Sequence, residues 1–161
     1  MRFLLSVVLL FLVQTAQAYP VVPDDELTPG DYCSESDSDF LYLRYEEQVP
    51  FCKRRVNRQL KQRVYEAYDI PSRCRSQYTV DHFIPLSMGG SNSIKNLWPE
   101  HYRVKELRMD LETDVHFKLE VGILTRDEAV ALVIQDKVMA RAVTQFPQGG
   151  TDCDQPDEVT P

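Results

Sequence analysis

Two long stretches of the chain, residues 53–68 and 101–121, carry an apolar residue at every fourth position. A helix that buries one face has this period, so both stretches are predicted to be helices. Gly122 is a natural end for the second helix. The apolar positions are Val56, Leu60 and Val64 in the first stretch and Leu107, Leu111, Val115 and Leu119 in the second.

Two further helices are predicted from their capping residues. Thr125 and Glu128 have the spacing of a capping box, in which each side chain binds the other residue's backbone, and they open a helix over residues 125–142. Ser36, or the acid after it, can cap a short helix over residues 36–47. The buried face of the longer helix is predicted to comprise Ala129, Leu132, Val133 and Met139.

Residues 78–100 have a different pattern. Residues 78–80 are β-forming, and residues 88–91 contain two glycines, which allow a turn with positive φ. Leu97 restores an apolar anchor after the turn, and Pro99 followed by an acid is typical of the entry to a helix. The predicted local order is therefore strand, loop, strand and helix.

These elements predict an α+β fold, a mostly helical single domain organised around that unit. The apolar fraction of 43% is ordinary for a globular protein, and the length suits one domain. We assign the domain to residues 32–146. The flanking segments, 19–31 and 147–161, are rich in acids and proline without periodicity, which predicts a flexible leader and a disordered tail.

Residues 1–18 have the features of a secretory signal peptide. Arg2 precedes an apolar run over residues 3–13, and residues 16–18 form a small-residue cleavage site. The run is too short to span a bilayer. The mature protein is therefore predicted to begin near Tyr19, to be periplasmic or extracellular, and to have no membrane segment.

The chain has four cysteines, and an exported protein favours disulfides over free thiols. Four cysteines permit three pairings. We favour Cys33 with Cys52, because both flank the same predicted helix, and Cys74 with Cys153, which would hold the tail. One pair staying reduced is the alternative.

The formal net charge is −7, but the charges are unevenly distributed. Residues 53–118 hold thirteen Lys and Arg against eight Asp and Glu, and the remaining residues hold five against seventeen. A basic segment of this kind is typical of a surface that follows a phosphate backbone. The candidate nucleic-acid-binding residues are Lys53, Arg54, Arg55, Arg58, Lys61, Arg73, Arg75, Arg103 and Arg108.

Asp81 and His82 carry the candidate chemistry. A carboxylate can hold a divalent cation, and a neutral imidazole can take a proton from water that attacks phosphorus. Adjacent strand residues point to opposite faces, so the two can serve one phosphate only where the strand's alternation breaks. Pro85 and the two glycines are predicted to supply that break. The amide of Asn96 can tie the loop to itself.

Five features together resemble the HNH endonucleases: Asp81-His82, Pro85-Leu86, Gly89-Gly90, Asn96-Leu97 and the placement of Asn96 fourteen positions after His82. The resemblance implies a ββα-metal unit at the centre of the fold. It implies that Asp81 binds metal, that His82 is the general base and that Asn96 braces the loop. The run from Asn96 to Glu100 is similar to a small exported branch of the family. Mg²⁺ or Mn²⁺ is the expected metal, with Zn²⁺ as an alternative.

The third metal ligand departs from the common HNH pattern, because its position falls on Lys105. Two alternatives remain on the same predicted helix. His101 stands at its first turn, whereas Glu112 and His116 are four residues apart on one face. Exported relatives resemble this chain in carrying a basic residue, Glu and His at four-residue steps, here Arg108, Glu112 and His116, so we favour Glu112.

The sequence therefore predicts an exported, metal-dependent HNH endonuclease that cleaves DNA with little sequence specificity, with RNA as an additional substrate class. One alternative is a catalytically silent nucleic-acid-binding module of the same fold. Another is a disulfide-stapled extracellular domain that binds a protein. A silent module keeps salt-sensitive affinity for DNA but ignores a chelator, whereas a protein-binding domain shows neither affinity nor cleavage. An inhibitor or partner protein is left open.

Overall fold

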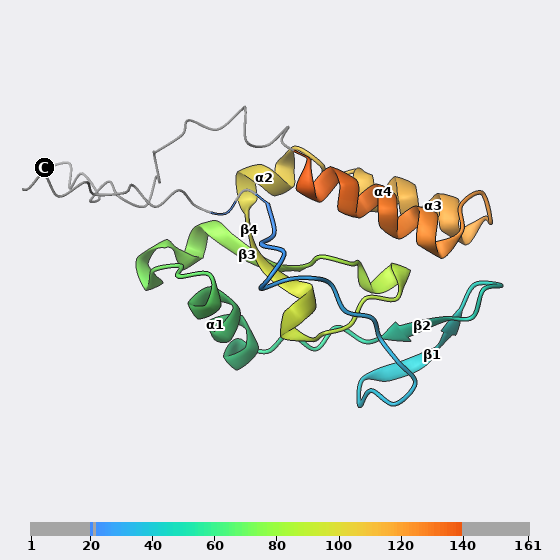
Figure 1. The fold of residues 1–161 in the computed structure, drawn as a ribbon, viewed down its shortest axis with the longest axis horizontal. Helices are drawn as coiled ribbons and strands as arrows, with labels where there is room; N and C mark the ends of the chain where they lie inside the picture. The colour runs from blue at the N-terminus through green and yellow to red at the C-terminus, as the bar shows by residue number, and fades with distance from the viewer. Residues whose placement is uncertain (1–19, 21, 140–161) are drawn as a thin grey trace, which may run out of the picture.

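The computed structural model describes residues 20 and 22–139, and it confirms the α+β class. Figure 1 shows two small antiparallel hairpins and a set of short helices. The strands are β1 (Phe40–Arg44), β2 (Val49–Cys52), β3 (Tyr78–His82) and β4 (Leu97–His101). The α-helices are α1 (Arg58–Ala67), α2 (Tyr102–Glu106), α3 (Leu111–Glu120) and α4 (Arg126–Val138), and the 3₁₀ helices are η1 (Ser72–Gln77), η2 (Leu86–Met88) and η3 (Ile94–Asn96).

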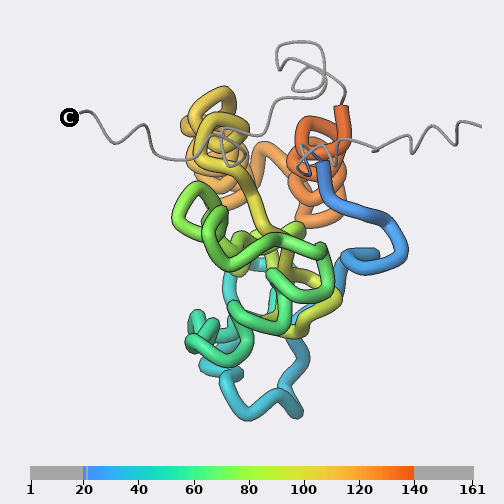
Figure 2. Tube along the Cα trace, turned by 90° about the vertical axis from the view of Figure 1, so that its left-hand side faces the viewer, coloured from blue at the N-terminus to red at the C-terminus, as the bar shows by residue number. Residues whose placement is uncertain are grey.

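The β3–β4 hairpin lies at the centre of the molecule. The α3–α4 pair lies on one side of it, and α1 and the β1–β2 hairpin lie on the other, as both views show (Figures 1 and 2). The strands pair in regular register from Tyr78 opposite His101 to His82 opposite Leu97. The predicted order of strand, loop, strand and helix is therefore observed.

The helix after β4 begins at Tyr102, one residue after the predicted start at residue 101. Pro99 and Glu100, which were predicted to open a helix, lie inside β4. A two-stranded sheet has only edge strands, so Pro99 can pair there although it has no N–H to donate. His101 is the N-cap instead, since its Nδ1 accepts a hydrogen bond from the Arg103 backbone at 3.2 Å.

The single helix predicted over residues 101–121 is wrong, because the chain forms the two helices α2 and α3. Val115 and Leu119 of the predicted apolar stripe are buried, but Leu107 is exposed at the break. Arg108 turns inward there and binds Glu100 of β4. The break lets α2 stay with β4 while α3 pairs with α4.

The short helix predicted over residues 36–47 is also wrong. These residues form β1 and the turn that leads to β2, with Tyr45 and Gln48 at positive φ. The predicted disulfide between Cys33 and Cys52 is present. The disulfide was predicted because the two cysteines flank a predicted helix. In the structure it joins the segment before β1 to the end of β2.

Helix α1 begins five residues later than predicted. Asn57 is its N-cap, with Oδ1 accepting from a backbone N–H three residues on at 2.9 Å. Val64 is fully buried and packs with Val80 of β3 and Leu97 of β4. Residues 53–57 lie in neither a helix nor a strand, and Arg54 donates to the Val80 carbonyl of β3 rather than lying on a helix face.

A second cluster lies between the β3–β4 loop and the two long C-terminal helices. The capping box of Thr125 and Glu128 opens α4 as predicted. Helix α4 runs to Val138, and residues 140–142 of the longer prediction lie outside the described residues. The buried members of the cluster are Ile84, Met88, Val115, Leu119, Ala129, Val130 and Val133.

The segment predicted to be a flexible leader lies against the domain. Thr28 is buried, and its hydroxyl donates to the Leu97 carbonyl at 3.0 Å. The Gly30 N–H donates to the Lys95 carbonyl at 3.0 Å. These contacts place residues 28–30 along the outer side of the loop that precedes β4.

Several predictions fall outside the described residues: the signal peptide, the acidic tail and Cys153. Cys74 is buried and has no disulfide partner within the described part of the chain. None of the helices described here is long and apolar enough to cross a membrane.

Candidate active site

The loop after β3 is held by Asn96, which is fully buried. Its Oδ1 accepts from the Ile84 N–H at 2.8 Å, and its Nδ2 donates to the Ile84 carbonyl at 3.0 Å and the Ser91 carbonyl at 2.9 Å. A Cβ on Gly90 would lie 1.9 Å from the Ile84 carbonyl oxygen, so only glycine fits there. This geometry suits the loop-bracing role that the resemblance implies for Asn96.

His82 lies at the end of β3, with only 4% of its surface exposed. Its Nδ1 lies 3.0 Å from Nη1 of Arg54, and its Nε2 lies 3.1 Å from Oδ1 of Asn92. A guanidinium can only donate, so Nδ1 carries the lone pair and Nε2 carries the proton. The two neighbours therefore fix one tautomer.

The environment of His82 keeps the ring neutral. The pKa of His82 is lowered to about 4, chiefly by burial and also by the positive charge of Arg54, while the hydrogen bond to Asn92 opposes both effects. An imidazole with this pKa carries no proton on Nδ1 at neutral pH. It is therefore in the protonation state that a general base requires.

Asn92 connects His82 to the segment that carries Arg54. Its Oδ1 also accepts from the Arg55 N–H at 3.0 Å, and its Nδ2 donates to the Lys53 carbonyl at 2.9 Å and to the carboxylate of Asp39. This residue was not among the predicted site residues. Its one sequence signal is its place directly after the glycine turn, where an amide can bind several backbone groups at once.

Asp81 points away from His82, because the strand pairing continues unbroken to His82. The break predicted from Pro85 and the glycines therefore comes too late to bring the two side chains together. Asp81 Oδ2 accepts from Lys105 Nζ at 2.9 Å. Burial would raise the pKa of Asp81, but the charges of Lys137 and Lys105 outweigh it and hold this pKa well below its ordinary value.

Glu100 lies beside Asp81 and is almost completely buried. Burial, and then the neighbouring Asp81 carboxylate, raise the pKa of Glu100. Its Oε1 accepts from Arg108 Nε at 3.0 Å, and its Oε2 lies 3.6 Å from Lys105 Nζ. The Arg108 guanidinium also lies over the Trp98 ring, 5.6 Å from its centroid. Arg108 thus acts as an internal counter-ion.

Lys137 is a buried cation that was not among the predicted site residues. Only 1% of its surface is exposed. Its Nζ donates to the His82 carbonyl at 2.7 Å and to Glu112 Oε1 at 2.5 Å. A signal for it exists in the sequence, since Ala129, Val133 and Lys137 are spaced four apart and Lys137 therefore continues the buried face of α4.

Each of the two predicted histidine ligands contacts an aromatic ring. His101 caps α2, stacks on the Tyr102 ring at 4.6 Å between centroids and meets the Tyr78 ring edge-on. His116 lies 6.2 Å from the ring of Tyr45, and its Nε2 is buried without a hydrogen-bond partner among the described residues.

One cluster could hold a metal ion by spacing alone. It comprises Cys33, Asp37 and Cys52, whose ligand atoms all lie within 4.8 Å of one another. It is the one such group among the histidine, cysteine and acidic side chains of residues 20 and 22–139. The two sulfurs are joined in a disulfide. Thiolate ligands at this position therefore require reduction first.

We compared the chain with protein-family models, curated proteins and solved structures. None of the three comparisons finds a match.

The predicted nucleic-acid-binding residues divide into two groups. Arg58 and Lys61 are exposed on α1, and Lys53, Arg54 and Arg55 line a pocket beside the β1 strand. The other four lie outside this stretch and, like Arg54 and Arg55, have contacts within the protein. Arg75 donates to the Ile70 carbonyl, Arg103 lies over the Tyr102 ring, Arg108 binds Glu100, and Arg73 also has a partner.

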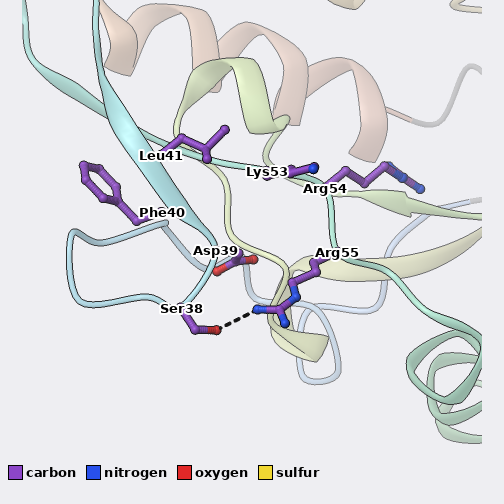
Figure 3. Close-up of a pocket in the computed structure, with 7 residues that line it drawn as sticks. All are labelled: Ser38, Asp39, Phe40, Leu41, Lys53, Arg54 and Arg55. Carbon is purple, nitrogen blue, oxygen red and sulfur yellow. Dashed lines mark hydrogen bonds between the residues drawn. The ribbon is translucent and has the colours of Figure 1, made fainter.

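The pocket beside β1 has a volume of about 380 Å³ and brings three consecutive basic residues together with Ser38 and Asp39. Figure 3 shows Arg55 extended toward Ser38, to which it donates at 3.1 Å, and Arg54 extended in the opposite direction. Arg54 therefore links the wall of this pocket to Nδ1 of His82.

The acidic residues around β3 fit a hard cation in their chemistry. Carboxylate oxygens are the donors that Mg²⁺ and Mn²⁺ prefer. In the structure these carboxylates form ion pairs with lysine side chains: Asp81 with Lys105, and Glu112 with Lys137. The ammonium of Lys137 marks where positive charge is accommodated, between a carboxylate and a backbone carbonyl.

Proposed function

We propose that this protein is an exported endonuclease of the HNH type, which hydrolyses phosphodiester bonds in DNA and in RNA with little sequence specificity. The observation that carries the proposal is His82, a neutral buried imidazole whose Nδ1 lone pair accepts a hydrogen bond from a guanidinium. Arginine is well suited to binding a phosphate. A base and a phosphate-binding group therefore meet at one point.

In the proposed reaction, Arg54 leaves Nδ1 of His82 and pairs with an oxygen of the scissile phosphate. Water takes its place, and Nδ1 accepts a proton as the water oxygen attacks phosphorus. The bond from phosphorus to the leaving 3′ oxygen breaks as the new bond forms, and the leaving oxygen takes a proton from solvent. Asn92 holds the proton on Nε2 throughout and so keeps the lone pair on the reacting side. Pairing with phosphate also removes the charge of Arg54 from the ring, which raises the pKa of His82 and makes it a stronger base.

A divalent ion, Mg²⁺ or Mn²⁺, would be held by Asp81 and Glu112. Because Asp81 points away from His82, the end of β3 must rearrange before the ion and the imidazole can serve one phosphate. The ion would then stabilise the negative charge that develops on the phosphate and the leaving oxygen. Asp81 is suited to this because its pKa is depressed, so it stays ionised. Glu112 is part-exposed and can turn toward an ion. Lys105 is about half exposed and can release Asp81 to solvent.

The exposed basic residues account for an affinity for nucleic acid that does not depend on its base sequence. Lys53 and Arg55 line the pocket of Figure 3, and Arg58 and Lys61 are exposed at the start of α1. Contacts of this kind position a nucleic acid by its phosphates and carry no base information.

A catalytically silent nucleic-acid-binding module is the second candidate. Two observations favour it: both ring nitrogens of His82 are hydrogen-bonded, and both Asp81 and Glu112 are paired with lysines. A module that never releases these pairs would bind nucleic acid and leave it intact.

The deciding experiment incubates the oxidised, exported protein with supercoiled plasmid and with RNA in Mg²⁺, Mn²⁺ or EDTA. Wild type is expected to cleave with metal and not with EDTA. His82→Ala is expected to lose about 10²–10⁴-fold in rate while retaining affinity, because the imidazole acts on the attacking water.

Arg55→Ala is the matched control, since Arg55 lines the same pocket and does not contact His82. Its cleavage rate is expected to fall through weaker binding and to recover at saturating nucleic acid. Binding without cleavage in every metal would instead establish the silent module. Cleavage by a folded His82→Ala protein within tenfold of wild type would exclude His82 from the chemistry.

A further inference from the structure

Lys137 occupies a position where the sequence pattern favours an apolar side chain. It continues the buried face of α4 after Ala129 and Val133, and only 1% of its surface is exposed. Burying an ammonium costs free energy unless its charge is paired, and a well-packed apolar side chain avoids that cost. A charge at this position therefore indicates that its surroundings require a cation.

Three separate elements converge on the Lys137 ammonium. Helix α4 delivers it from its last turn, the first turn of α3 supplies Glu112 at 2.5 Å, and the end of β3 supplies the His82 carbonyl at 2.7 Å. Its charge also acts on Asp81, where it is the strongest of the charges that keep the carboxylate ionised. The ammonium thus serves two acidic groups and one carbonyl.

A carboxylate, a carbonyl oxygen and a second carboxylate nearby are also the donors of a divalent cation site. An ammonium and a metal ion cannot both occupy such a space, because their charges repel at short range. Whichever cation is present excludes the other. The competition follows from the position of Lys137 and does not depend on which metal binds.

We propose that Lys137 is a built-in competitor of divalent metal, which fills the cation position between Glu112 and β3 and must move away before an ion binds there. The inference rests on the proposed function in taking Asp81 and Glu112 as the metal ligands. Its consequence is a protein with weak affinity for divalent ions, in which removal of one buried lysine creates a tighter site.

The test measures Mn²⁺ binding by calorimetry in the oxidised protein, without nucleic acid. Lys137→Met keeps the length and the apolar stem and removes the charge, and we expect it to bind Mn²⁺ at least tenfold more tightly than wild type. Lys137→Gln is expected to do the same while keeping a hydrogen-bond donor near the His82 carbonyl. Adding Glu112→Gln to Lys137→Met is expected to abolish the gain.

Lys118→Met is the matched control, because Lys118 is an exposed lysine of α3 and its loss changes the net charge equally. It is expected to leave Mn²⁺ affinity within twofold of wild type. Equal affinities in wild type, Lys137→Met and Lys118→Met would overturn the inference. So would a gain that persists in the Glu112→Gln double variant.

A variant that unfolds still gives an answer. If the loss of the buried charge unfolds Lys137→Met, millimolar Mn²⁺ is expected to restore its circular dichroism spectrum, because the ion replaces that charge. Failure of Mn²⁺ to restore it would overturn the inference. Absence of cleavage in wild type, together with the expected gain in affinity, would count against the proposed function and leave the inference standing.

Discussion

The two ring nitrogens of His82 have different surroundings, and this difference defines the candidate site. Nε2 is bound by Asn92, which is itself held by the backbone of the segment before α1. Nδ1 faces Arg54, which also donates to the Val80 carbonyl at 2.8 Å. The protein therefore fixes the ring firmly on one side and covers its lone pair with a group that a phosphate can attract.

The first prediction is a pH dependence of stability that belongs to His82. Its folded-state pKa of about 4 lies below the ordinary value of 6.5, so the unfolded chain takes up the proton first as pH falls. Full stability is therefore present above pH 6.5 and is lost between about pH 6.5 and 4. Linkage gives a loss of about 3 kcal/mol. Urea unfolding at several pH values measures it.

His82→Gln is the reference for that measurement, because glutamine is polar and does not titrate. The difference in unfolding free energy between the two proteins removes the contribution of every other group, including Glu100, whose raised pKa gives the opposite slope. A difference that stays constant from pH 7 to pH 4 would show that the ring is not held neutral.

The second prediction concerns Asn96. Replacement by alanine leaves three buried backbone groups of the loop, on Ile84 and Ser91, without their partners. Each such group costs about 1–3 kcal/mol, so Asn96→Ala is expected to lose roughly 3 kcal/mol or more of unfolding free energy. Lys95→Ala, at the exposed neighbouring position, is expected to stay within about 0.5 kcal/mol of wild type. A similar loss of unfolding free energy in both variants would show that Asn96 does not brace the loop.

Among the elements, the β1–β2 hairpin supports the site from outside. It starts beside Asp39, which binds Asn92, and it ends at Cys52, next to the Lys53 carbonyl that Asn92 also binds. The disulfide to Cys33 fixes this end of the hairpin. The orientation of His82 thus depends on an element that is distant from it in the sequence.

The third prediction is that reduction of this disulfide lowers stability more than it changes the chemistry. Loss of a native disulfide in a small exported domain costs about 2–5 kcal/mol. Cys33→Ser together with Cys52→Ser is expected to lower the unfolding free energy in urea by this amount, with cleavage at low temperature reduced less than tenfold. Mass spectrometry of the exported protein should find this pair oxidised, and four free thiols would contradict the prediction.

The sequence identifies elements well where apolar spacing and capping agree. The Thr125 capping box and the β3 strand are in their predicted places. It fails over residues 36–47, where an acid-flanked aromatic run suits either a capped helix or a strand, and the pairing with β2 decides. It also misses the break at Arg108, because the buried partner of that arginine is eight residues back in β4.

For the whole molecule, the candidate site gathers side chains from five separate stretches of sequence. Local pattern reveals Asp81, His82 and Asn96, since they lie in one motif. Asn92 and Lys137 become meaningful only after folding, because their partners lie up to 55 positions away. The split of charge is visible in the sequence, but the pairing of Arg108 and Lys137 with the carboxylates of Glu100 and Glu112 is not.

The last prediction concerns the surface on which nucleic acid binds. Arg58 and Lys61 are exposed on the first turns of α1, near the pocket that contains Arg54 and Arg55. For duplex DNA, the slope of log affinity against log salt falls by about 0.9 for every phosphate that the protein no longer neutralises. Arg58→Ala with Lys61→Ala is therefore expected to weaken binding and to reduce this slope by about 1–2, measured by fluorescence anisotropy between about 50 and 200 mM salt.

Lys118→Ala with Lys95→Ala removes the same charge from exposed positions on α3 and η3, and it separates a local contact from a net-charge effect. If only long-range electrostatic attraction contributes to binding, both double variants would lose affinity for DNA equally, because each changes the net charge by two. With direct phosphate contacts along α1, only the Arg58 and Lys61 pair reduces the slope. Equal slopes in the two variants would show that nucleic acid does not bind along α1. The proposed route by which a phosphate reaches Arg54 and His82 would then be wrong.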